Sequence, residues 1–169
     1  MPREEFERLV AEEFPNAVPE DFKRKIENVA FLIESEPSLE LRAEEGLGLN
    51  ETLLGHYRGV PHTARGDSYG LGATLPDTIT LFQLPIEEEA DYLLEKELAA
   101  SVSPHTDIFL LENSYARADA LRSVGLNTRR SALVRKVIRD TIWHEVAHHF
   151  GMDESAVRKR EDERQKGIL

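Results

Sequence analysis

Apolar side chains recur every three or four positions in the first part of the chain, which is the spacing of one helix face. Over residues 6–14 this spacing predicts a helix, which we expect Pro15 to end. Residues 19–36 have the same spacing and predict a second helix, with Pro19 in its first turn and Pro37 after its end. The outer faces of both stretches are acidic, so we expect two packing helices with solvated exteriors.

The middle of the chain changes to an extended pattern. Residues 52–59 predict a strand that leads into a turn at residues 59–61. Residues 63–77 are rich in glycine and predict a loop. Residues 78–84 alternate and consist largely of β-formers, so they predict the clearest strand, which we expect Pro85 to break.

Helical spacing returns in the second half of the chain. Residues 86–100 predict a helix, and residues 102–128 are compatible with a short strand or with more helix. A long helix is predicted from residue 128 or 131 to Phe150, where Gly151 is a natural C-terminal stop. The elements together indicate the α+β class.

The length of 169 residues and the hydrophobic content of 40% suit one folded domain with a core of its own. We therefore predict a single domain over residues 1–169. Within it, residues 88–127 are a candidate lid or insert over a cleft. After Val157 the chain is almost entirely charged, and we expect the tail of residues 157–169 to fray.

Acidic residues outnumber basic ones by 32 to 21, giving a net charge of -11. Such a surface repels nucleic acid and anionic lipid, so we expect neither as a partner. The N-terminus is charged from Arg3 and no apolar run approaches the roughly 20 residues that span a bilayer. A cytoplasmic location is the resulting expectation.

The chain has no cysteine and only 6 histidines, so any metal must be held by imidazole and carboxylate groups. His144 and His148 lie four residues apart in the last predicted helix, which directs both rings off one face toward a single cation. Glu145, beside His144, is better placed as a base for a metal-bound water than as a ligand. The pattern predicts a zinc site.

The third metal ligand is expected just after the helix, because a chain that turns at Gly151 can return toward the metal. Glu154 has the most suitable spacing, Asp153 is the near alternative, and an acidic residue from elsewhere is a third. His149 points about 100° away from His148 on a helix. We expect it to lie behind the ligands or at the surface.

Three further side chains, Tyr57, Arg65 and Tyr69, could polarise a substrate carbonyl or hold an oxyanion. Ordinary packing in or beside the glycine-rich loop is the alternative interpretation for each of them. No role is assigned to His56, His62 and His105.

Three blocks in this order resemble the minimal zincins, small predicted zinc metallopeptidases of the bacterial cytosol. They are residues 59–65, the strand 79–82 with Pro85-Ile86 after it, and residues 144–154. The resemblance implies a small mixed sheet whose edge strand flanks the cleft, packed on an active-site helix. It also implies zinc ligation by His144, His148 and the acidic residue after Gly151, here Glu154 by spacing, with Glu145 as base.

The leading hypothesis is therefore a zinc-dependent peptidase acting on peptides or proteins, with an extended peptide added to the strand at residues 78–84. The alternative is a zinc-binding regulatory or protein-interaction module with the same fold and little proteolytic activity. A pair of histidines that binds no metal is the third hypothesis.

Overall fold

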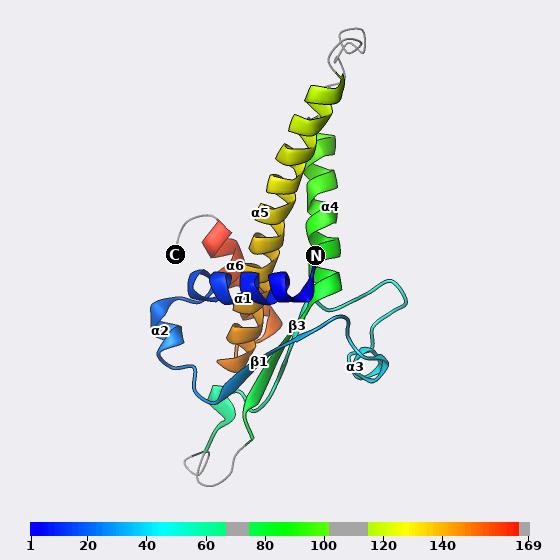
Figure 1. The fold of residues 1–169 in the computed structure, drawn as a ribbon. Helices are drawn as coiled ribbons and strands as arrows, with labels where there is room; N and C mark the ends of the chain where they lie inside the picture. Colours follow the sequence, from blue (N-terminus) through cyan, green and yellow to red (C-terminus); the bar gives the residue numbers. More distant parts are fainter. Residues whose placement is uncertain (67–74, 102–114, 166–169) are drawn as a thin grey trace.

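The computed structural model describes residues 1–66, 75–101 and 115–165 (Figure 1). Its elements, in chain order, are α1 (Arg3–Ala17), α2 (Glu20–Lys23), β1 (Val29–Glu34), α3 (Leu39–Glu44), β2 (Gly55–Arg58), the 3-10 turn η1 (His62–Ala64), β3 (Asp77–Phe82), α4 (Gln83–Ser101), α5 (Tyr115–His149) and α6 (Glu154–Gln165).

The sheet has three strands in the order β1-β3-β2. β3 pairs in parallel with β1 and antiparallel with β2, so the small mixed sheet expected from the sequence is present. Because β3 has a partner on both sides, it offers no free edge. The expectation that a peptide adds to residues 78–84 is therefore wrong, and the free edges belong to β1 and β2.

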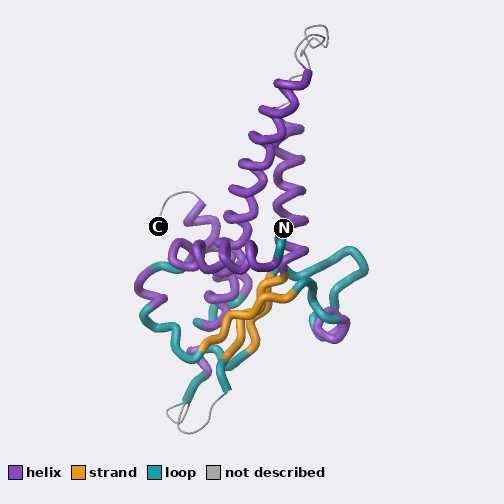
Figure 2. The backbone as a smooth tube through the Cα atoms, in the orientation of Figure 1, coloured by secondary structure: helices purple, strands orange, loops and turns teal. Residues whose placement is uncertain are grey.

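Helix α5 is the element against which the rest of the molecule packs. It contacts β2 and β3 on one side, and α1 and α4 also lie against it (Figure 2). Its buried apolar side chains recur every four residues and meet those of β3 and α1 in one core. Its fully or nearly fully buried members include Phe6, Leu9, Ile79, Leu81, Val134, Ile138, Ile142 and Val146.

The second predicted helix is wrong over most of its length. Only Glu20–Lys23 is helical, and Val29–Glu34 forms β1. Asn28 has a φ of 56°, which turns the chain just before the strand. Short apolar runs fit either periodicity, and here the β-branched and aromatic residues are extended because β3 supplies hydrogen-bonding partners.

Two prolines do not break the elements as expected. Pro15 lies inside α1, which continues to Ala17, because a proline in the last turn removes only one backbone hydrogen bond. The strand β3 already ends at Phe82, and Pro85 is the third residue of α4. The first N–H groups of a helix have no intrahelical partner, so proline is tolerated there.

The C-terminal half is more helical than predicted. Helix α5 begins at Tyr115 rather than near residue 128, and the charged tail forms α6 instead of fraying over residues 157–165. α4 and the first part of α5 run side by side away from the sheet (Figure 1). Residues 102–114, Tyr69 and His105 lie outside the described residues. Among the residues that the structure describes, none of the helices combines the length and the apolar character of a transmembrane span.

One buried carboxylate with two arginine partners allows the packing of α1 on α5 to be tested. Glu13 of α1 is only 4% exposed and accepts hydrogen bonds from Arg135 and Arg139 of α5, at 2.6 Å each. Burial alone would raise the pKa of Glu13, but the two arginine hydrogen bonds outweigh it and hold the pKa below its ordinary value. A carboxylate with a lowered pKa stabilises the fold at neutral pH, and this contribution disappears as the pH falls through that pKa.

Glu13→Gln should therefore lower the free energy of unfolding by about 1–3 kcal/mol at pH 7, as measured by urea denaturation. The difference from the unsubstituted protein should shrink below about pH 4. Glu12→Gln is the matched control, because Glu12 is 40% exposed in its ion pairs with Arg8 and Arg135 and should contribute less stability than Glu13. Equal losses of unfolding free energy in both variants would show that burial of the Glu13 carboxylate adds no stability to its ion pairs.

Candidate metal centre

His144 and His148 project from the same side of α5, as four-residue spacing on a helix requires. Their rings are 30% and 24% exposed, whereas Val146 and Ala147 between them are fully buried. The two Nε2 atoms are 3.2 Å apart. Burial of the apolar face of α5 thus fixes the rotation of the helix and aims both imidazoles at one point.

The end of α5 is shaped by Gly151, which has a φ of 82°. Its N–H donates to the His148 carbonyl at 2.8 Å, and the Met152 N–H donates to the Ala147 carbonyl at 3.0 Å. These two bonds define a Schellman turn, which favours glycine at this position. A side chain here would also collide with Thr63 of η1.

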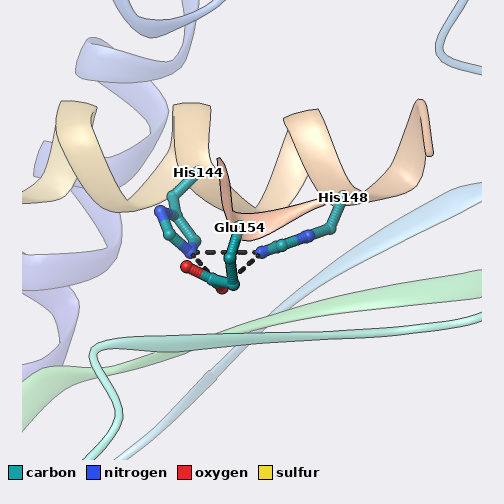
Figure 3. A group of neighbouring side chains, drawn as sticks. All are labelled: His144, His148 and Glu154. Atoms are coloured by element: carbon teal, nitrogen blue, oxygen red, sulfur yellow. Dashed lines mark hydrogen bonds and ion pairs between the residues drawn. The ribbon is translucent and has the colours of Figure 1, made fainter. Parts of the chain in front are cut away.

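The turn starts α6 and brings Glu154 back to the histidines. Its Oε1 lies 3.4 Å from Nε2 of His144 and 3.2 Å from Nε2 of His148. Figure 3 shows the three side chains converging on one point. Asp153 is used differently, because its Oδ1 accepts a hydrogen bond from the Ala156 N–H at 2.9 Å and caps α6. Of the two carboxylates weighed from the sequence, the structure brings Glu154 to the cluster.

Each histidine has an acceptor behind it. Nδ1 of His148 lies 3.0 Å from the Met152 carbonyl, and Nδ1 of His144 lies 3.1 Å from Oε1 of Glu161 on α6. A carbonyl or an ionised carboxylate can only accept, so each ring carries its proton on Nδ1. In the neutral rings, both Nε2 lone pairs then face Glu154, which is the arrangement of metal-binding imidazoles.

Sequence reasoning missed Glu161, because we expected the tail to fray. The sequence nevertheless contains a pattern that indicates the position of Glu161. Glu154, Val157 and Glu161 are spaced by three and four residues, which places them on one face of a helix.

Glu145 of α5 is 6% exposed, and its side chain lies against β2 at Gly55. Burial raises its pKa to about 7, against the lowering effects of His144 and of a hydrogen bond from the Tyr57 backbone N–H. The strand approaches closely because residue 55 is glycine. A Cβ on Gly55 would lie 2.9 Å from both Cγ and Oε1 of Glu145 and 2.8 Å from Cγ2 of Thr141.

Behind β2 lies a buried polar cluster around Asp77, which is 3% exposed. The Tyr57 hydroxyl donates to Oδ2 of Asp77 at 2.8 Å, Arg65 pairs with the same oxygen, and Nδ1 of His149 lies 3.1 Å from it. Tyr57 and Arg65 are thus directed to Asp77 rather than to the metal-ligand cluster. His149 is fully buried behind the ligands, not at the surface, and burial together with the Arg65 charge lowers its pKa.

The remaining described histidines have local contacts. Nε2 of His56 lies 3.4 Å from a carboxylate oxygen of Glu45, and the His62 ring lies 5.9 Å from that of Phe150, centroid to centroid.

Two adjoining cavities meet at the candidate centre. One, of about 550 Å³, is bounded by β2, by residues 61–64 and by the three converging side chains. The other, of about 420 Å³, shares Leu53, Gly55, His144 and Glu145 with the first and extends toward α4. Its apolar lining consists of Leu53, Leu54, Leu93, Val137 and Trp143.

H-E-x-x-H on a helix is a motif that is typical of zinc metallopeptidases. The sequence model of the family of zincin-like metallopeptidases matches residues 26–105 and 121–164, most of the chain. The chain belongs to this family, which confirms the resemblance noted from its three sequence blocks. A comparison with curated proteins gives no match.

The contact at Gly55 is open to a direct test. Gly55→Ala should force β2 away from α5, because the added Cβ meets Thr141 and Glu145 well inside contact distance. We expect a loss of about 1–3 kcal/mol in the free energy of unfolding, measured by chemical denaturation. Gly66→Ala is the control, since a Cβ there meets no described atom within 4 Å. Unchanged stability in Gly55→Ala would mean that the strand does not pack this closely on Glu145.

Proposed function

We propose that the protein is a zinc-dependent peptidase in which His144, His148 and Glu154 hold the metal and Glu145 is the general base. The observation that carries this proposal is the spacing of the three donor atoms, which are separated by 3.2, 3.2 and 3.4 Å. A tetrahedral zinc ion with ligands at about 2.1 Å separates neighbouring donors by about 3.4 Å.

The chemistry of the donors supports the same metal. Two imidazole nitrogens and one carboxylate oxygen form a donor set found in catalytic zinc sites, which leave a fourth position for water or substrate. The backbone carbonyl behind His148 and the carboxylate behind His144 favour the ring tautomer that a metal requires. Among the described residues, this is the group of three or more potential ligands that lies close enough for one ion.

When bound, zinc supplies Lewis acidity that lowers the pKa of a water and polarises a substrate carbonyl. Glu145 follows His144 directly and would accept the proton of the attacking water. It would then deliver that proton to the amide nitrogen as the peptide bond breaks, so that the amine leaves neutral. Its position against β2 keeps the carboxylate from moving away from the cleft.

The edge of β2 is the proposed docking strand for an extended peptide. The Leu54 carbonyl bonds to the Phe82 N–H at 2.9 Å and therefore faces β3. Because backbone groups alternate in direction along an antiparallel strand, those of Gly55 and Tyr57 face the cleft. The Tyr57 N–H donates to the Glu145 carboxylate, so the groups proposed for peptide pairing are those of Gly55 and the Tyr57 carbonyl. A peptide paired with them would lie across the metal centre and could place one side chain in the apolar neighbouring cavity.

The open cleft also favours catalysis over a purely regulatory zinc module. The cavity at the three ligands measures about 550 Å³, and no described residue of the stretch 88–127 lines it. A histidine, His56, is among the side chains at its wall. A site blocked by the insert would have favoured the binding role.

The role of Glu145 predicts a separation of binding from turnover. Glu145→Gln should retain one equivalent of zinc, measured by metal analysis, and should lose peptide-library cleavage by at least about 100-fold, because the amide cannot take a proton. Glu95→Gln removes an exposed glutamate of α4 and should leave both properties unchanged. Cleavage by Glu145→Gln at the unsubstituted rate would refute the mechanism.

The third ligand can be tested with two neighbouring carboxylates. Glu154→Ala should weaken zinc binding by more than the roughly 10–100-fold that is typical of a lost outer partner, as measured by chelator competition. Asp153→Asn should bind zinc normally, since asparagine also caps helices. The reverse result would assign the ligand to Asp153.

A further inference from the structure

The short helix α6 turns three functional side chains toward α5. Glu154, Val157 and Glu161 fall within about 60° of one another around the helix axis. Glu154 reaches the Nε2 atoms, and Glu161 lies 3.1 Å from Nδ1 of His144. The carboxylates that approach the two ring nitrogens of His144 therefore come from one helix.

Val157 lies between these two glutamates and is fully buried. It packs in a small apolar cluster with Trp143 and Ala147, each the residue immediately before a proposed ligand of α5. Val157 is the one buried side chain among those of α6 that the structure describes. A mostly charged helix of 12 residues with one buried anchor is only marginally stable by its own propensity.

Besides the Val157 anchor, α6 approaches α5 where Glu154 lies against the two histidines. When both rings are neutral and carry their proton on Nδ1, two imidazole lone pairs and a carboxylate oxygen meet at separations of 3.2–3.4 Å. Three electron-rich atoms at this distance repel one another, and a cation at their centre converts the repulsion into ligand bonds.

We propose that α6 is a zinc-dependent clasp, in which docking of the helix and binding of the metal are one coupled event. Glu154 contributes the ligand, Val157 the apolar anchor, and Glu161 is a positioning residue that holds the His144 ring with its Nε2 toward the metal. This inference rests on the proposed zinc site. It adds that docking of α6 controls zinc binding, because displacement of the helix removes a ligand and an orienting carboxylate together.

The first test follows amide hydrogen exchange of the full-length protein at pH 8 with zinc and with excess chelator. Zinc should slow exchange in residues 150–163 far more than in α1 or β3. Equal exchange of this segment under both conditions would overturn the clasp.

The second test isolates Glu161. Glu161→Ala should weaken zinc binding about 10–100-fold in chelator competition, and Glu161→Gln should lose less, because its amide oxygen still accepts from Nδ1–H. The visible absorption of the Co²⁺-loaded protein should change in Glu161→Ala, which reports ligand orientation rather than stability. Asp162→Asn is the matched control on the exposed side of α6 and should change neither property.

Denaturation of the metal-free proteins separates positioning from folding. Glu161→Ala should unfold at the same denaturant concentration as the unsubstituted chain. If Glu161→Ala binds zinc as tightly as the unsubstituted protein, the positioning role is wrong even where peptides are cleaved. If the clasp measurements succeed without any peptide cleavage, the clasp stands and the proposed reaction is wrong. A chain that binds no zinc overturns both.

Discussion

The structure depends on helix α5, which packs in the core with one face and carries two candidate metal ligands on another. The buried stripe of α5, with Ile138, Ile142 and Val146, fills the core against β3 and α1, and its other face carries His144 and His148. Successive residues of a helix point about 100° apart, so a slip of one residue in this packing would turn both imidazoles out of the cleft. The hydrophobic effect that folds the chain is thus also what orients the candidate ligands.

Two boundaries of the cleft, one end and one side, are set by backbone geometry rather than by apolar burial. At one end, the Schellman turn at Gly151 reverses the chain and presents the Met152 carbonyl to His148. Along one side, the missing side chain of Gly55 lets β2 touch Glu145. Each glycine allows a close approach that any larger residue would prevent, and the two approaches bracket the same metal centre.

The parts of the site that could be predicted from sequence are those set by local spacing. His144, Glu145 and His148 lie within one helical turn, and Gly151 with Glu154 follows from the way helices end. Their convergence needed no knowledge of the sheet. The strand β1 could not be predicted, because its backbone is extended only through pairing with β3, which is distant in sequence.

Glu161 and the Asp77 cluster depend on similar long-range contacts. Helix α6 forms where Val157 meets Trp143 and Ala147, and Asp77 is surrounded by side chains from β2, the loop after η1 and the end of α5. The spacing of Glu154, Val157 and Glu161 indicates a common helix face, but no local pattern indicates that this face meets α5 or that the side chains around Asp77 assemble. The Asp77 cluster also has a practical consequence. The wall of the cleft is braced from inside the protein, so changes that disable the cleft can arise at buried positions that touch neither metal nor peptide. A map of inactivating substitutions would extend inward from the site, and intact ligands would be no proof of an intact cleft.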